Sequence, residues 1–171
     1  MRVKGVKLNQ NEQLIEAFYQ AFQQRNAAGM TGCYDPSIHF SDPVFRDLHG
    51  LEVDAMWAML CDQGTDLEIV FGDISAEDQT GSAHWEATYT LGSTGRSIHN
   101  RIDAHFEFQN GRIIRHVDNF DLWKWSRMAL GITGTIGGWS GPLKMKIRET
   151  ANRALARYIE THPEYQDEPE S

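Results

Sequence analysis

Asp118 and His116 are the residues whose types and spacing best suit proton transfer. They lie two residues apart in an expected strand, residues 112–121, so both side chains share one face. If that face lines the interior of a fold, Asp118 becomes a carboxylate in apolar surroundings, where it would serve as a proton acceptor or donor. The competing interpretation places Asp118 in solvent or in an ion pair with Arg112 or Arg115.

Asp42 is a second candidate carboxylate. It lies near the end of a short expected strand, Ile38-His39-Phe40-Ser41-Asp42-Pro43, which the proline ends because it has no amide hydrogen to donate. Across a pocket, Asp42 would supply a second acid–base group. A turn in which the aspartate side chain bonds its own backbone explains the same residues, and this structural interpretation is favoured.

Apolar side chains on the expected strands would form either a pocket wall or simply a core. Packing alone accounts for each of the aromatic residues. Asn100 differs because an amide on an apolar face needs a hydrogen-bond partner, for which Asp118, a ligand and a water are candidates. The expected lining set is Tyr19, Trp85, Tyr89, Asn100, Ile102, Phe106 and Phe120.

The opposite, polar face of the strands carries a row of metal-ligating residue types. A zinc site needs three or four convergent ligands with supporting hydrogen bonds, whereas strand alternation alone generates such a row. We therefore expect no metal and no cofactor, and interpret the face as solvated or dimer-facing. The row consists of His84, His99, Asp103 and His105.

The elements that must position these residues fall into two halves. Before residue 66 the apolar residues recur at helical spacing, and after it they alternate at every second position. Helices followed by a run of antiparallel strands indicate an α+β domain. Helices are expected at about residues 9–28, 30–34 and 51–62, and strands at 38–43, 67–75, 83–91, 97–108 and 112–121.

The C-terminal region predicts a helical extension. A helix is expected at 122–130 and a loop over the glycine-rich segment 131–141, after which Pro142 begins a further helix that ends near His162. This last helix is basic and amphipathic. Packing on its own domain is favoured over contact with an anionic membrane surface. The acidic tail from Glu164 is expected to be disordered.

The composition describes a folded, acidic protein. The chain has 171 residues, 40% hydrophobic and 23% charged, with a net charge of −8 and a pI near 5.3. These values suit one domain with a core and argue against a general nucleic-acid binder, which needs a basic surface. Cys33 and Cys61 are interpreted as reduced, buried thiols, which is favoured over a disulfide between them. Because neither a signal-peptide pattern nor a long apolar run occurs, we expect a cytoplasmic location.

Two motifs resemble the SnoaL-like and nuclear transport factor-like superfamily, which includes ketosteroid isomerase, limonene epoxide hydrolase and polyketide cyclases. Gly111-Arg-Ile-Ile-Arg-His-Val-Asp118-Asn-Phe-Asp-Leu122 resembles the final strand of the epoxide hydrolase and the cyclases. In those relatives the aspartate at the position of Asp118 faces the cavity and acts as a base. Phe40-Ser41-Asp42-Pro43 is similar to the ketosteroid isomerase segment that holds its general base.

The resemblance implies a cystatin-like cone, in which a curved antiparallel sheet wraps around the N-terminal helices and a C-terminal helical extension is added. It also implies a homodimer, because relatives often pair through the convex face of the sheet. The expected divisions are an N-terminal tail 1–8, a cone domain 9–125, a helical extension 126–163 and an acidic tail 164–171.

The rest of each relative's machinery does not match. Phe18, not Tyr19, stands where ketosteroid isomerase has its oxyanion-hole tyrosine, and Ala104 stands in place of its protonated aspartic acid. Trp85 and Ala87 stand where the epoxide hydrolase has an arginine and a second aspartate. Of that enzyme's triad, only the Asp118 position is retained.

Three functions follow as hypotheses. The first is cofactor-independent acid–base catalysis of isomerase, cyclase or epoxide hydrolase type on a small, mostly apolar, oxygenated molecule, with Asp118 as the base and His116 and Asn100 orienting. The second is a non-catalytic cone that binds a small ligand or dimerises. The third is a peripheral membrane or adaptor protein that uses the basic C-terminal helix.

Overall fold

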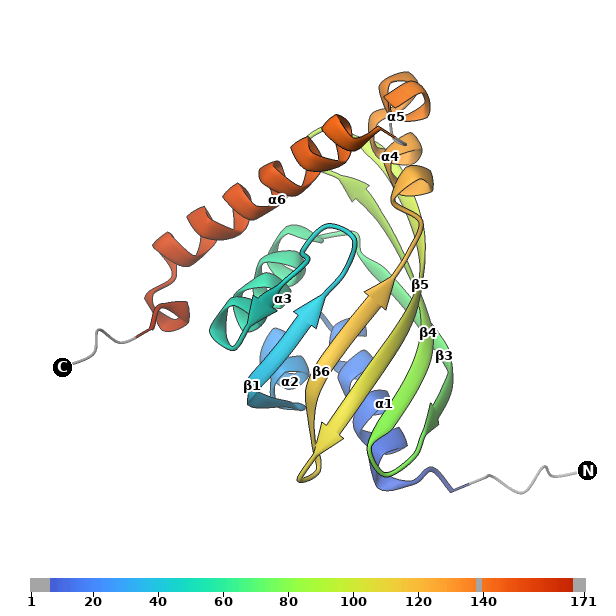
Figure 1. Ribbon diagram of the computed structural model, residues 1–171, viewed down its shortest axis with the longest axis vertical. Coiled ribbons are helices and arrows are strands. Elements are labelled where there is room, and N and C mark those ends of the chain that lie inside the picture. Colours follow the sequence, from blue (N-terminus) through green and yellow to red (C-terminus); the bar gives the residue numbers. More distant parts are fainter. Residues whose placement is uncertain (1–6, 138–139, 168–171) are drawn as a thin grey trace, which may run out of the picture.

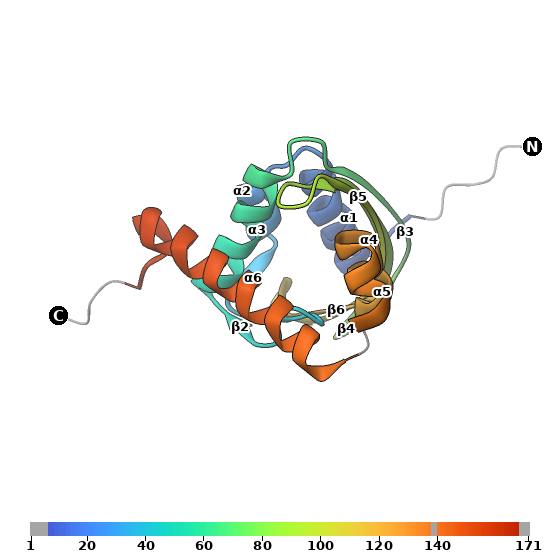
Figure 2. The same ribbon diagram turned by 90° about the horizontal axis from the view of Figure 1, so that it is seen from above.

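A computed structural model describes residues 7–137 and 140–167 of the chain. A curved sheet wraps around α1 and α3, and the long α6 slants across the upper end of this cone (Figures 1 and 2). The elements are α1 (Gln10–Gln23), α2 (Ala27–Thr31), β1 (Tyr34–Ser41), β2 (Leu48–His49), α3 (Leu51–Gln63), β3 (Glu68–Ala76), β4 (Thr80–Leu91), β5 (Arg96–Gln109), β6 (Arg112–Asn119), α4 (Leu122–Leu130), α5 (Ile132–Gly137), α6 (Gly141–Thr161) and a 3-10 turn η1 (Pro163–Tyr165).

The sheet has six strands in the order β2-β1-β6-β5-β4-β3. The α+β class and the cone are confirmed, but the sheet is not wholly antiparallel as expected, because β1 pairs with β6 in parallel. Strands joined by tight turns must run antiparallel, whereas β1 and β6 are joined through most of the domain and are free of that constraint. This pairing brings the C-terminal ends of β1 and β6 to the same end of the cone.

Strand alternation decides which side chains face inward. On β5, Ile98, Ile102, Ala104, Phe106 and Phe108 are buried, and the residues between them are exposed or half-buried. The predicted faces of β4 and β5 are therefore confirmed, and with them the placement of the histidine row on the outer face. The inner face packs against the apolar stripe of α1, whose buried members are Ile15, Phe18, Tyr19 and Phe22.

The first helix is shorter than expected. Asn9 begins α1 with a capping box: its side chain accepts the Glu12 backbone N–H at 2.9 Å, and the Glu12 carboxylate accepts the Asn9 N–H at 2.8 Å. The helix ends at Gln23, not near residue 28, because Asn26 starts a new helix by accepting the backbone N–H of Gly29 at 3.0 Å.

The expected loop at residues 131–141 contains a helix, so that prediction is wrong over α5. Gly131, with φ of 62°, ends α4, and Gly134 lies directly against the Ser126 backbone, where an added Cβ would clash with the carbonyl oxygen. Gly134 therefore permits α5 to pack closely against α4. The expectation of a loop rested only on the number of glycines in the segment. Residues 138–139 of this segment lie outside the described residues.

The long C-terminal helix packs on the domain. Leu155 is buried in the core, and the hydroxyl of Tyr158 donates a hydrogen bond to Asp62 on α3 at 2.5 Å. The tail beyond it was expected to be disordered from Glu164, but η1 is ordered and Tyr165 packs against the core. Tyr165 anchors this segment because its aromatic ring packs on apolar surface, although the surrounding sequence is acidic. Among the described residues, none of the helices combines the length and apolarity needed to cross a membrane.

Candidate functional site

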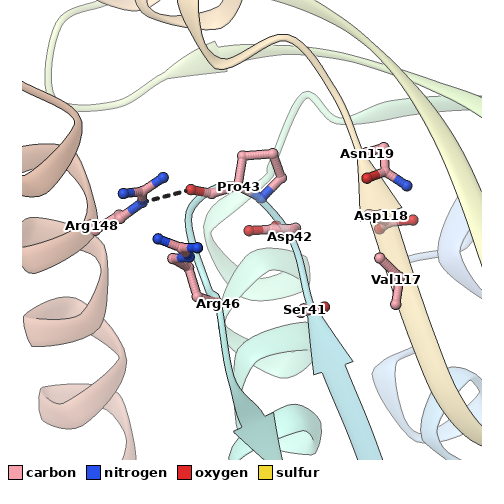
Figure 3. A pocket seen from close by; sticks show the side chains of 8 residues that line it. All are labelled: Ser41, Asp42, Pro43, Arg46, Val117, Asp118, Asn119 and Arg148. Atoms are coloured by element: carbon pink, nitrogen blue, oxygen red, sulfur yellow. Dashed lines mark hydrogen bonds between the residues drawn. The ribbon is translucent and has the colours of Figure 1, made fainter. Parts of the chain in front are cut away.

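A cavity of about 300 Å³ lies at one end of the cone, which we call the mouth. It is bounded by the end of β1, the end of β6 and the side of α6 (Figure 3). The parallel pairing of β1 with β6 and the crossing of α6 therefore create it. Its lining residues are Ser41, Asp42, Pro43, Arg46, Val117, Asp118, Asn119 and Arg148.

Asp118 is held by one oxygen and free at the other. Its side chain is 3% exposed, and its Oδ1 accepts the indole N–H of Trp85 at 3.2 Å and lies 3.0 Å from Nε2 of His116. The other oxygen, Oδ2, has no hydrogen-bond partner among residues 7–137 and 140–167. Two polar neighbours fix the orientation of the carboxyl group through Oδ1, which leaves Oδ2 available to a bound molecule.

A chain of buried hydrogen bonds stands behind Asp118. Trp57 donates its indole N–H to the Tyr34 hydroxyl at 2.9 Å, and this hydroxyl lies 2.8 Å from Nδ1 of His116. Burial raises the pKa of Tyr34 well above its ordinary value, so the hydroxyl keeps its proton. These bonds assign the tautomer: Tyr34 donates to Nδ1, and Nε2–H of His116 donates to Asp118.

Asp42 is both a turn residue and a cavity residue. Its Oδ1 accepts the backbone N–H groups of Val44 and Phe45, each at 2.6 Å, as the turn interpretation predicted. Burial, with a smaller effect from the charge of Asp118, raises the pKa of Asp42 to about 7 against the opposing effect of the two backbone N–H groups and Arg148. A carboxyl group with this pKa is protonated for part of the time near neutral pH.

Two arginines complete the charge pattern at the mouth. Arg148, on α6, donates from Nε to the carbonyl oxygen of Pro43 at 2.9 Å, which fixes it across the cavity from β6. Arg46 lies beside Arg148, on the side of the cavity away from β6 (Figure 3), and is exposed. The cavity therefore presents two carboxyl groups and two guanidinium groups to a bound molecule, with Pro43 and Val117 as its apolar surface.

The structure brings together part of the predicted site. Asp118 and Asp42 line one cavity, and His116, completely buried, lies beneath Asp118. The seven residues expected to line a pocket do not line the mouth cavity. Tyr19, Trp85, Ile102 and Phe106 are buried in the core, Tyr89 accepts a hydrogen bond from Trp125, and Asn100 and Phe120 are half-buried.

Two of these residues have notable polar atoms. The hydroxyl of Tyr19 is buried and has no hydrogen-bond partner among the described residues, and burial raises the pKa of Tyr19 well above its ordinary value. Asn100, expected to need a partner such as Asp118, lies opposite Ala87 in the sheet, whereas Asp118 lies opposite Ala104. The separation along β5 explains why the two polar side chains do not pair.

Sequence reasoning missed four members of the site: Tyr34, Trp57, Arg46 and Arg148. Tyr34 was expected to end a helix but begins β1, and Trp57 had only a helical apolar stripe to mark it. Arg148 lies 105 residues from Pro43 in the sequence, so no local pattern could place it at the mouth. For Arg46, the one signal available in the sequence was its position four residues after Asp42.

Comparison with known proteins supports the fold. The model of the SnoaL-like domain family matches residues 15–116, which is more than half of the chain. The match ends just before Asp118. No curated protein matches the chain at a significant level.

Solved structures share the fold at low identity. An NTF2-like protein of unknown function from Burkholderia pseudomallei is 17% identical, covers 72% of this chain and 100% of its own, and has a TM-score of 0.63. A putative SnoaL-like polyketide cyclase from a Jannaschia species is 16% identical, covers 72% of this chain and 96% of its own, and has a TM-score of 0.62. An LEH-like epoxide hydrolase from Mycobacterium tuberculosis is 16% identical, covers 74% of this chain and 95% of its own, and has a TM-score of 0.60. The helices, the six-stranded curved sheet and the family match agree, and the chain belongs to the SnoaL-like domain family.

Proposed function

We propose that this protein binds a small oxygenated molecule at the mouth of its cone and catalyses a cofactor-independent acid–base reaction of isomerase, cyclase or epoxide hydrolase type, with Asp118 as the base. One observation carries the proposal: Asp118 and Asp42 line the same cavity, and each is anchored through Oδ1 while its Oδ2 has no partner among the described residues. Two carboxyl groups in different environments suit opposite roles in proton transfer.

Asp118 suits the role of base. Its contacts to Trp85 and His116 hold the carboxyl group in place, and Oδ2 would take a proton from a carbon acid or from a water that attacks the substrate. His116 acts as a positioning residue because it fixes Oδ1 and is itself fixed by Tyr34. In an isomerisation the same oxygen returns the proton to another carbon of the substrate, so Asp118 ends in its starting state. In an epoxide hydration the proton taken by Asp118 passes to solvent after product release, and Asp42 regains a proton from solvent.

Asp42 suits the role of acid. With a pKa of about 7 it carries a proton for part of the time near neutral pH and would donate it to the substrate oxygen. Arg46 and Arg148 would stabilise negative charge that develops on that oxygen. The volume of about 300 Å³ is at the lower end of the range for small-molecule sites, and the charged lining favours a substrate more oxygenated than apolar.

Turnover measurements test this assignment. A panel of small epoxides, enolisable ketones and cyclisable polyketide-like compounds would be screened with the wild-type protein. Asp118→Asn keeps the size of the side chain and should lower kcat/KM by about 100- to 10,000-fold, the usual contribution of a general base. Asp103→Asn, on the outer face opposite Asn119 in the sheet, is the matched control. Full activity of Asp118→Asn would remove it as the base.

The filling of the cone favours a second candidate, a non-catalytic module. Aromatic side chains occupy the interior in which related enzymes would hold a substrate, so the fold would serve to bind a ligand at the mouth or to form a homodimer through the outer face of the sheet. In that case ligand binding survives in Asp118→Asn without turnover in either protein. Sedimentation equilibrium separately tests the dimer.

A further inference from the structure

The β1–β2 edge of the sheet holds two histidines and an aspartate in contact. His39 and His49 are paired across the two strands, and their rings are stacked with centroids 4.2 Å apart. Nε2 of His39 lies 2.5 Å from Oδ1 of Asp47, and Nε2 of His49 lies 3.1 Å from the same oxygen. One nitrogen from each ring and one carboxylate oxygen all lie within 4.8 Å of one another.

We propose that His39, Asp47 and His49 form a binding site for one borderline divalent transition-metal ion, with Zn²⁺ as the representative ion. Imidazole nitrogen and carboxylate oxygen are the ligand types that zinc accepts, and three protein ligands with an open fourth position are a common zinc arrangement. A hard ion such as Mg²⁺ prefers oxygen ligands alone. Strand alternation marks only the outer row of histidines in the sequence, and no local pattern marks this set.

The distances fit an ion after a small adjustment. With Zn–N and Zn–O bonds of about 2.0 Å, tetrahedral ligand atoms lie about 3.3 Å apart. The 3.1 Å separation of His49 and Asp47 is already close to that value. The 2.5 Å separation of His39 and Asp47 must widen, and the Asp47 side chain, 69% exposed, has room to move outward. An ion would also attract both ring nitrogens and the carboxylate at once, which a single shared proton cannot do.

The backbone already holds the ligands in place. His39 and His49 are fixed by strand pairing, and Asp47 ends the loop whose turn is closed by the backbone bond from Asp42 N–H to the Phe45 carbonyl at 2.7 Å. The same loop carries Arg46 into the mouth cavity. A metal at this site therefore ties down a segment of the cavity wall, while its binding is independent of the reaction proposed there.

The outer face of the sheet offers a matched control. His84 uses its two ring nitrogens on two different carboxylates, those of Asp103 and Glu86, while His99 contacts Glu86 alone. This histidine-rich cluster is comparable in residue type and exposure, but its ligand atoms are not gathered: in the described part of the chain, only the His39 set brings three together. A site defined by geometry should therefore distinguish the two.

Calorimetric titration of tag-free, chelator-treated protein with Zn²⁺ tests the proposal. We expect one Zn²⁺ per chain, no competition from millimolar Mg²⁺, and an upward shift of Tm on binding. His49→Gln should weaken Zn²⁺ binding by at least about 100-fold, because even the loss of an outer-shell partner costs about 10- to 100-fold. His99→Gln should bind as the wild type does.

Measurements of Tm without metal show whether each variant remains folded. In the wild type, the ligand-field absorption of the Co²⁺-substituted protein reports nitrogen ligation. His39→Gln provides a second variant at the site should His49→Gln fail to fold. The proposal is overturned if Zn²⁺ does not saturate at one equivalent, if both glutamine variants at the site bind normally, or if His99→Gln loses binding equally.

Discussion

The interior and the mouth of the cone are built from the same strands but differ in chemistry. Along β6, His116 lies on the inner face among Phe18, Phe40, Trp57 and Phe106, and two residues further Asp118 reaches the cavity. The face does not change, since neighbours at this spacing point the same way. The packing around the face does change: aromatic side chains enclose His116, whereas Asp118 lies where the strand leaves the aromatic core and can contact a bound molecule.

The largest expected effect is in the interior. Phe106→Ala should lower the free energy of unfolding by about 3–5 kcal/mol, because it leaves a cavity in a close-packed aromatic core, where Phe106 is 2% exposed. Arg46→Ala, at the exposed edge of the mouth, should change it by less than about 0.5 kcal/mol. Urea unfolding measures both, and similar losses would abolish the contrast between the two regions.

The second effect concerns pH at the mouth. The folded pKa of Asp42 is about 7, above the value near 3.9 of an unfolded aspartate, so the native protein holds a proton that the unfolded chain has lost. This stabilisation is full below about pH 4 and is lost as pH rises through 7. Between pH 5 and pH 8 the wild type should therefore lose about 2–3 kcal/mol relative to Asp42→Asn.

Unfolding free energies of the two proteins at pH 5 and pH 8 check this sign. Asparagine keeps the oxygen that accepts the Val44 and Phe45 N–H groups, so the turn is retained. A constant difference between the two proteins across this range would show that Asp42 titrates like an exposed carboxylate.

The third effect tests the hydrogen bonds behind Asp118. Tyr34→Phe removes the hydroxyl that joins Trp57 to His116, which leaves a buried indole N–H and a buried ring nitrogen without partners. The cost should be about 1–3 kcal/mol of unfolding free energy. Thermal or urea unfolding measures it, and a neutral result would mean that these groups find other partners.

The smallest effect is the same substitution at the other buried tyrosine. The hydroxyl of Tyr19 has no hydrogen-bond partner among the described residues, so Tyr19→Phe removes a desolvated polar group at no loss of a bond. We expect a neutral to stabilising change of less than about 1 kcal/mol. A loss as large as that of Tyr34→Phe would reveal a partner, such as a buried water, for the Tyr19 hydroxyl.

Local patterns predicted those parts of the fold that depend on local physics. Alternation in β4 and β5 gave the inner and outer faces because each residue's direction follows from its neighbours. The end of α1 was missed although Asn26, a common N-cap residue, marks it in the sequence, and the helix α5 was missed because Gly134 acts through a packing contact that the pattern does not contain. The short strand β2 was missed because two residues carry no periodicity.

The site was predictable only in part for the same reason. Asp118 and His116 share a strand face, so their proximity followed from spacing alone. Tyr34 reaches His116 across 82 residues, and Arg148 reaches Pro43 across 105. These contacts depend on the parallel pairing of β1 with β6 and on the path of α6, which no segment encodes by itself. The cavity lies at the mouth because aromatic and aliphatic side chains fill the interior of the cone.

The coupling of Asp42 to Asp118 is tested most directly by a carboxyl-carbon NMR titration of the wild type, Asp118→Asn and Asp103→Asn. In the wild type and in Asp103→Asn, Asp42 should titrate at a pKa of about 7. In Asp118→Asn the pKa of Asp42 should fall, because the Asp118 charge that raises it is gone, while burial keeps it above its ordinary value. An ordinary aspartate pKa for Asp42 in the wild type, or no change on removal of the Asp118 charge, would contradict an acid–base pair sharing the mouth cavity.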